Sequence, residues 1–208
     1  STGQIVALTT AQIKALTTSQ IPAFTTDQIA ALETLDVAAL STTAIASLST
    51  DQAAALSTAQ IVALKTQQIA AMTTGQIGNL STDQISVLSS AQTAVLSTTQ
   101  VAILSSDQIV ALSTDSFAAL SSNAIAVLTT DAISALTTGQ IVALSSRQTA
   151  ALTTDQIAAL TTGQLNGLSS AVLNGLGTAN LGALTTAQVA GIKQTALNFL
   201  NTANMASL

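Results

Sequence analysis

Apolar residues recur along this chain with a period of eight. We name the eight positions a to h, with a at residue 8 and at every eighth residue after it. Position a is Leu throughout, except at Phe24, Met72 and Ile192. Position f is mainly Ile, e is most often Gln, and b and c are mostly Ser or Thr. The stretch 152–160, LTTDQIAAL, shows the pattern in full.

This period excludes one long helix. Eight residues at about 100° each turn through roughly 800°, which is about 80° more than two full turns. The apolar stripe would therefore wind around a continuous helix and never face a single partner. Each octad must contain its own break.

The polar residues predict where each break lies. With Thr153 at b as N-cap, Gln156 at e becomes N3, and Ser/Thr-x-x-Gln is a capping box. Positions a and f then become N′ and N4, the pair that forms a hydrophobic staple. We expect one short helix in every octad. Position c is hydroxylated more strictly than b, so either c is the true cap or c contacts a neighbouring layer.

A longer period appears in the departures from the octad. Four Asp residues at position d lie 24 residues apart: Asp83, Asp107, Asp131 and Asp155. This spacing predicts three octads per coil, and hence an all-α solenoid shaped as a triangular prism with a and f lining its core. The alternative is a three-sided β-solenoid, which the many Thr and Ile favour. The alternative needs strict alternation, whereas h and a are adjacent and both apolar.

Several departures predict local features. Pro22 lies inside an expected helix, where it removes a backbone donor. Thr93 and Thr149 place a hydroxyl at the inward position f. Larger side chains replace Ala at h in four octads, which predicts a locally wider core: Val87, Val95, Ile103 and Val127.

The two ends differ. Residues 1–186 form the octapeptide-repeat solenoid, and 187–208 are expected to form a C-terminal capping segment, with one longer helix over 187–200 that bears Phe199. The N-terminus begins in mid-array, so the first coil is expected to expose Ile5, Leu8 and Ile13. Such a face predicts end-to-end self-association there.

Composition excludes several functions. Cys and His are absent, which rules out disulfides, Cys/His metal sites and thiol or imidazole catalysis. The net charge is −5 with only four basic residues, so no basic patch exists to bind nucleic acid. Mean hydropathy is +0.57, yet Ser and Thr interrupt every octad and no stretch approaches the roughly 20 apolar residues of a membrane span.

Three candidate chemistries remain. The column Asp83, Asp107, Asp131 and Asp155 is a weak candidate for calcium, because one carboxylate per layer supplies too few of the six to eight oxygens that the ion needs. Ser and Thr lack any base to activate them, so we expect no enzyme and no cofactor. An ice-binding Thr face is the third, although Ser replaces Thr at c on all three sides.

The octad LTTDQIAAL resembles Ser/Thr-rich octapeptide regions of large bacterial secreted and cell-surface proteins, including type I secreted, adhesin-like proteins. The resemblance covers the whole chain. It implies an extracellular or cell-surface stalk, spacer or fibre segment without a catalytic site. The alternative is a binding module, either an adhesin or an ice-binding face, that uses the hydroxyl-lined sides.

Overall fold

The computed structural model describes residues 1–198 and 200–208. Over this range every octad contains one short helix, and no residue belongs to a β-strand. The all-α solenoid is therefore confirmed, and the β-solenoid alternative is wrong. The chain divides into two compact units, Ser1–Leu104 and Ser105–Leu208, which are described separately.

The helices follow one another at intervals of one octad. The first unit contains α1 Thr2–Val6, α2 Thr10–Lys14, η1 Ile21–Ala23, α3 Thr26–Ala30, α4 Thr34–Val37, α5 Thr42–Ala46, α6 Thr50–Ala54, α7 Thr58–Ala63, α8 Thr66–Ala71, α9 Thr74–Gly78, α10 Thr82–Ser86, α11 Ser90–Thr93 and α12 Thr98–Ala102. The second contains α13 Ser106–Ala111, α14 Thr114–Ala118, α15 Ser122–Ala126, α16 Thr130–Ala135, α17 Thr138–Val142, α18 Ser146–Ala150, α19 Thr154–Ala159, α20 Thr162–Gly167, α21 Ser170–Gly175, α22 Gly177–Leu181, α23 Thr186–Gly191, α24 Gln194–Leu197 and α25 Thr202–Met205.

Capping decides where each helix begins and ends. In α7 the Ser57 hydroxyl at b accepts a hydrogen bond from the backbone nitrogen of Gln60 at 3.2 Å. In return, the Gln60 side-chain Oε1 accepts from the backbone nitrogen of Ser57 at 2.7 Å. After the helix, Leu64 at position a is extended, with φ −61° and ψ 136°, and the chain turns there into the next octad. Position b is therefore the N-cap.

Position c has a different role, which explains why it varies less. Thr50 lies against the next coil, because a Cβ built on Gly75 would come within 3.3 Å of Thr50 Cγ2. Thr162 lies in the same way under Gly191. Only a small side chain fits between two coils at this point. The second interpretation of c, contact with a neighbouring layer, is the correct one.

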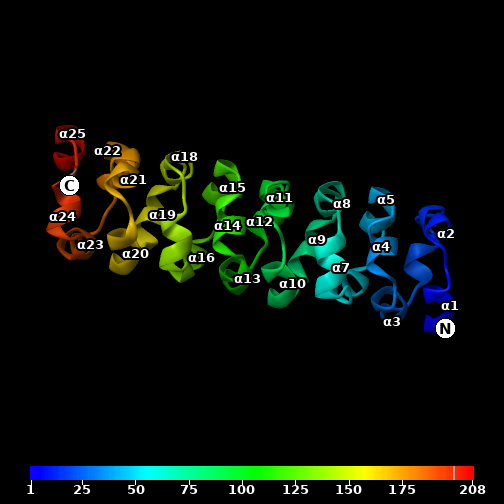
Figure 1. Ribbon diagram of the computed structural model, residues 1–208. Coiled ribbons are helices and arrows are strands. Elements are labelled where there is room, and N and C mark those ends of the chain that lie inside the picture. The colour runs from blue at the N-terminus through cyan, green and yellow to red at the C-terminus, as the bar shows by residue number, and fades with distance from the viewer. Residues whose placement is uncertain (199) are drawn as a thin grey trace. The chain divides into compact units, whose positions relative to one another are not determined.

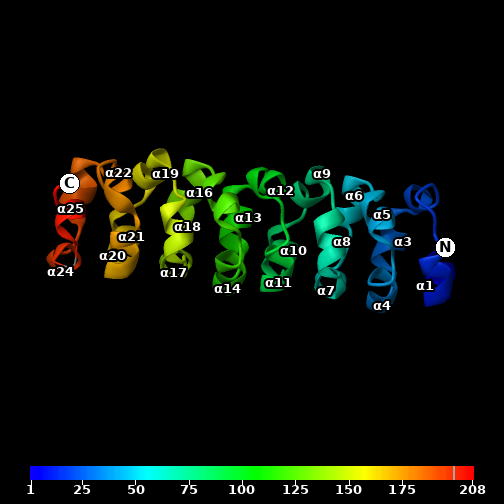
Figure 2. The ribbon, with the colours of Figure 1, turned by 90° about the horizontal axis from the view of Figure 1, so that it is seen from above.

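Three octads make one coil. Each helix contacts the helix three octads further along, as in the pairs α4·α7, α5·α8 and α6·α9 of the first unit and α13·α16, α14·α17 and α15·α18 of the second. Figure 1 shows α4 and α5 side by side with α7 and α8, and Figure 2 shows α6 beside α9. The 24-residue spacing of the Asp residues therefore reports one full coil.

The core is lined by positions a and f, as expected, and also by e. Leu56 and Ile61 are buried, and so is Gln60 between them in the octad pattern. In the four octads with an enlarged side chain at h, that side chain lies outside the core, and Val87 is half-buried. Val95, Ile103 and Val127 are 38–44% exposed, so the expectation of a wider core there is wrong. Position h follows directly after the last turn or C-cap, on the side of the helix away from f.

Two local departures are absorbed by backbone hydrogen bonds. Thr149 at f is fully buried, and its hydroxyl donates to the Ser145 carbonyl at 2.8 Å, one turn earlier in the helix. Pro22 lies near the start of η1, a three-residue 3₁₀ turn that replaces the usual α-helix. A turn so short requires no amide hydrogen from Pro22.

Both ends correct the sequence-based expectations. Ile5 and Ile13, both at f, are buried within the first coil, so the expectation that they are exposed is wrong. Leu8 at a is half-buried, so it is exposed only in part. The single helix expected over 187–200 is divided into α23 and α24, because Ile192 is extended and buried at a corner of the coil. Phe199 lies outside the described residues.

Candidate functional site

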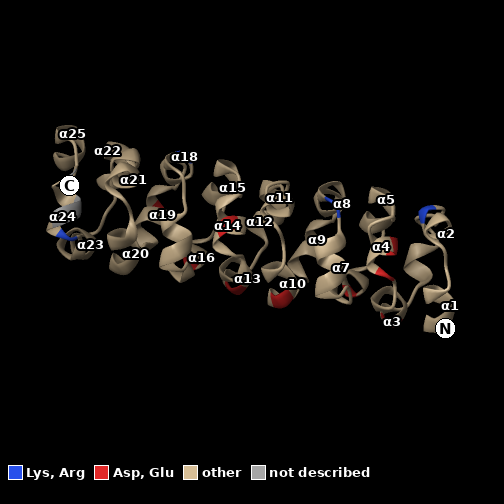
Figure 3. Cartoon of the chain, viewed as in Figure 1, with Lys and Arg blue, Asp and Glu red and all other residues tan. Residues whose placement is uncertain are grey.

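The Asp column projects from helix starts. Asp83, Asp107, Asp131 and Asp155 are each the second residue of a helix, α10, α13, α16 and α19, and all four are exposed. In the second unit α13 contacts α16 and α16 contacts α19, so Asp107, Asp131 and Asp155 lie one per coil. Figure 3 shows acidic residues on these helices. At N2 a carboxylate interacts favourably with the helix dipole.

The described residues form no metal-binding cluster. Nowhere among them do three His, Cys, Asp or Glu side chains gather closely enough to hold a metal ion. Nor is any helix within the described range long and apolar enough to cross a membrane. The Asp column remains a row of single carboxylates.

The most regular polar feature of the structure is a glutamine clamp at position e. Gln76 Oε1 accepts from the Thr73 nitrogen at 2.8 Å and completes the capping box of its own helix. Its Nε2 donates to the carbonyls of Ile45 at 2.9 Å and Leu48 at 2.6 Å in the preceding coil. One side chain thus caps a helix and fastens two coils together.

The clamp recurs in both units. Ten glutamines donate to the carbonyls 28 and 31 residues earlier: Gln52, Gln60, Gln68, Gln76, Gln92, Gln100, Gln140, Gln156, Gln164 and Gln188. Gln84 and Gln148 use the carbonyls 28 and 30 residues earlier. All of these glutamines are buried.

The sequence predicted the capping half of this role and missed the clamp. The signal was present, because position e never carries Glu, which serves a capping box as well as Gln does. A carboxylate has no N–H to donate, whereas the Gln amide has two. A strict preference for Gln over Glu therefore indicates that a donor is required.

Asparagines take over the coil-to-coil contacts near the C-terminus. Asn166 at g donates to the Gly191 carbonyl at 2.8 Å and accepts from the Lys193 nitrogen at 2.8 Å. Asn174 accepts from the Asn201 nitrogen at 2.9 Å, one octad later. These asparagines replace the usual residue at g, and their side chains join the last coils in addition to the glutamine clamp.

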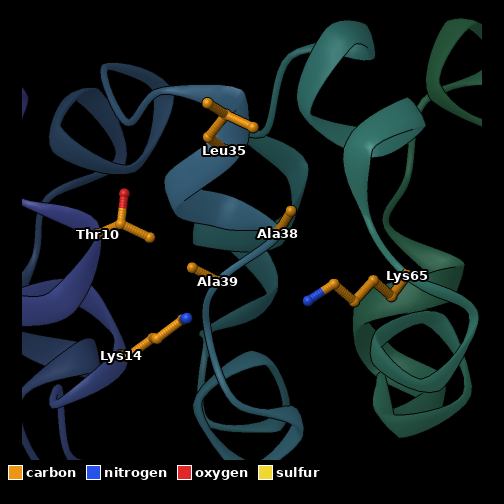
Figure 4. A pocket seen from close by; sticks show the side chains of 6 residues that line it. All are labelled: Thr10, Lys14, Leu35, Ala38, Ala39 and Lys65. Carbon is orange, nitrogen blue, oxygen red and sulfur yellow. The ribbon is translucent and has the colours of Figure 1, made fainter.

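One groove on the first unit breaks the regularity of the surface. It has a volume of about 320 Å³ and is lined by Thr10 and Lys14 from α2, by Leu35, Ala38 and Ala39 from α4 and its end, and by Lys65. Figure 4 shows Lys14 and Lys65 directed toward one another from opposite sides of Ala38 and Ala39. No motif in the sequence indicates a site here.

Comparison with protein families matches one repeat model along nearly the whole chain. The ALTTAQ repeat covers residues 1–34, 29–66, 61–98, 87–114, 114–146, 135–162 and 162–194. The chain belongs to the ALTTAQ repeat family. No curated protein matches its sequence.

The ALTTAQ motif is written out in residues 7–12 and 183–188. In the octad it runs from h to e, across the corner of the coil. It therefore contains the extended Leu of the corner, the N-cap, the small residue between coils, and the clamp glutamine. Four of the six motif positions, a, b, c and e, thus have a defined role in this structure.

Proposed function

We propose that this ALTTAQ chain is a non-catalytic structural module, a stalk, spacer or fibre segment of a bacterial exported surface protein. The glutamine clamp carries the proposal. Two or three hydrogen bonds from each clamp residue join successive coils within each unit, and the same bonds recur in register. Because each coil contacts only its neighbours through the same bonds, coils can be added to the array without a change in the repeat sequence, as a spacer requires.

The use of the hydroxyl groups supports the same proposal. The hydroxyls at b accept from backbone nitrogens of their own helices, as Ser49 does from Gln52 at 3.1 Å. The side chains at c pack between coils. The chain has no His or Cys to activate a hydroxyl or to serve as a nucleophile. The polar residues therefore hold the array together.

The spacer proposal is tested by changing the number of coils. Chains with one coil deleted, residues 57–80, and with the same coil duplicated are compared with the native length by small-angle X-ray scattering. A spacer predicts a maximum dimension that shifts by the same amount in each direction, about 8–10 Å for one layer of packed helices. A dimension that does not follow the coil number would contradict it.

The exported location has its own test. The parent protein is probed on intact cells of the organism that produces it, with an added protease that cannot enter them. Digestion of the repeat region on intact cells is the expected result. Protection until the cells are lysed would reject the surface location while leaving the spacer role open to the length experiment.

A second candidate function, an ice-binding face, has one observation in its favour. In the second unit α14, α17, α20 and α23 contact one another in order, and each begins with an exposed Thr at c: Thr114, Thr138, Thr162 and Thr186. Thermal hysteresis of the purified chain separates the candidates. Hysteresis that is lost in the variant Thr114→Ser/Thr138→Ser, which keeps a small hydroxylated side chain at c, would favour ice binding. A native chain without hysteresis favours the spacer.

End-to-end self-association at the N-terminal face belongs to the same proposal. Leu8, Leu16 and Phe24 of the first coil are only half-buried, and a second copy would cover them. Sedimentation equilibrium over a range of concentrations measures the association. Leu8→Glu should abolish it, and a chain that stays monomeric at every concentration would exclude it.

A further inference from the structure

We propose that the groove lined by Lys14, Leu35 and Lys65 binds a small organic monoanion with an apolar body, such as a medium-chain or aromatic carboxylate. The proposal is independent of the spacer function. It begins from the sequence, because the three residues are departures from the octad that the fold itself does not require.

Each of the three is unusual at its position. Lys14 is the single charged residue at g, Leu35 is the single large apolar residue at d, and Lys65 is one of only two basic residues at b, the other being Lys193. A Lys at b gives up the N-cap hydrogen bond, since an ammonium has no acceptor, and α8 accordingly lacks a side-chain cap bond. The exposed side chain of Leu35 is 73% accessible, the most of any large apolar residue described.

The coil brings these departures together. Lys14 lies in α2, Leu35 in α4 and Lys65 directly before α8, far apart along the chain, yet they line the same groove. Two of the four basic residues of an acidic chain are thereby placed on one small surface. Figure 4 shows the two ammonium groups facing across the floor formed by Ala38 and Ala39, with Leu35 beside it.

The charge of the groove defines the ligand. Asp36 is buried beside it, 4% exposed, and accepts from the Thr10 hydroxyl at 2.9 Å, so its carboxylate is already bonded and closed to a ligand. The two lysines and Asp36 together carry a net charge of +1. A single negative charge balances this sum.

The apolar floor and the size define the rest of the ligand. Ala38, Ala39 and the Leu35 side chain offer no hydrogen bonds, so the part of the ligand that lies on them is hydrocarbon. A volume of about 320 Å³ is near the lower end of small-molecule sites. The groove thus fits a carboxylate or sulfonate on a short aliphatic or aromatic body.

The test uses the fluorescent probe 1-anilinonaphthalene-8-sulfonate with the full chain at low salt. The chain has no Trp or Tyr to interfere. We expect one saturable site, from which octanoate displaces the probe and from which octanol and octylamine do not. Equal displacement by octanol would show an apolar patch without anion recognition and would overturn the proposal.

Matched variants locate the site. Lys14→Gln and Lys65→Gln should each weaken binding by about fivefold, the upper value for an exposed charge pair, and by roughly twentyfold together. The double variant Arg147→Gln/Lys193→Gln removes the same net charge from the second unit and should leave the dissociation constant within about twofold, since distant exposed charges are screened. Circular dichroism checks that each variant is folded.

Leu35→Ser provides an independent readout, because it removes apolar contact and leaves the charge unchanged. It should weaken octanoate more than acetate, as acetate has almost no hydrocarbon to lose. Equal weakening by the control double variant and by the Lys14/Lys65 double variant would attribute binding to overall charge and reject the groove. Absence of saturable binding would reject it as well.

Discussion

At the scale of single residues, a clamp glutamine forms hydrogen bonds through both the oxygen and the nitrogen of its side-chain amide. In Gln76 the oxygen caps α9 and the nitrogen joins two coils. Gln12 makes the same cap bond to the Thr9 nitrogen at 2.8 Å, yet it lies exposed in the first coil. Gln12 therefore has the capping role alone, whereas Gln76 has both the capping and the coil-to-coil role, and a comparison of the two measures the second role.

Gln76→Leu should destabilise the chain more than Gln12→Leu. Both changes lose the hydrogen bond from the N-cap backbone nitrogen to the glutamine Oε1, worth about 0.5–1.5 kcal/mol. Only the change at Gln76 also leaves the buried Leu48 carbonyl without its donor, which costs about 1–3 kcal/mol more, whereas the Ile45 carbonyl still accepts from the Leu48 nitrogen. Urea unfolding followed by circular dichroism measures both variants. Equal midpoints would show that the coil-to-coil bonds contribute nothing.

Two glycines of α20 form a second matched pair. A Cβ on Gly167 would come within 2.7 Å of Thr138 Cγ2 in the preceding coil, whereas a Cβ on Gly163 meets nothing nearer than 3.8 Å. Gly167→Ala should cost about 1–3 kcal/mol from overpacking, and Gly163→Ala should stabilise by up to about 1 kcal/mol. Thermal melting compares them. Thr138→Ser, which removes the methyl group, should restore part of the loss.

The octad pattern predicts some roles of single residues and misses others. The period, the cap at b and the inward positions a and f follow from local rules that act within one octad. The clamp and the interlayer role of c depend on contacts with a coil 24 residues or more away. The groove is harder still, because Lys14, Leu35 and Lys65 have no motif in common and meet only through the geometry of the coil.

At the scale of elements, each helix is too short to be stable alone. Isolated helices need about 12–15 residues to be even marginally stable in water, and the helices here have four to six residues apart from the three-residue η1. Caps and packing must therefore supply what length does not. This is why a 3₁₀ turn can replace an α-helix at η1 without breaking the array.

The position of proline tests this view. Ala70 occupies g in α8, as Pro22 does in its octad, but α8 is a full α-helix of six residues. Ala70→Pro should cost about 3 kcal/mol or more, because the ring clashes with the preceding turn and removes a helical donor. Pro22→Ala should change stability by less than about 1 kcal/mol, because η1 uses no amide hydrogen there. Chemical denaturation of both variants gives the comparison, and similar costs would contradict it.

At the scale of the whole molecule, stability is expected to grow with each added coil. In the first coil Gln4, Gln12 and Gln20 are exposed, and Leu8, Leu16 and Phe24 are half-buried. A preceding coil would offer carbonyls to these amides and cover these side chains.

Adding 24 consensus residues before Ser1 should raise the melting temperature. Each half-buried side chain that becomes covered contributes roughly half of the about 1.5–3 kcal/mol that full burial is worth. A scrambled 24-residue extension of the same composition is the control. Equal melting temperatures for the two extensions would show that the first coil is already complete on that side.

The clamp has a direction. Each donor amide lies 28 to 31 residues after the carbonyls that it binds, as with Gln140 and Leu112 or Ile109. A ribosome therefore makes the acceptors first and the donor about one coil later. Each newly made coil can close on the one already folded without waiting for distant sequence, and the loop to be closed stays equally short however long the array becomes. Such a chain can assemble progressively from its N-terminus during synthesis, and its folding rate need not fall with its length.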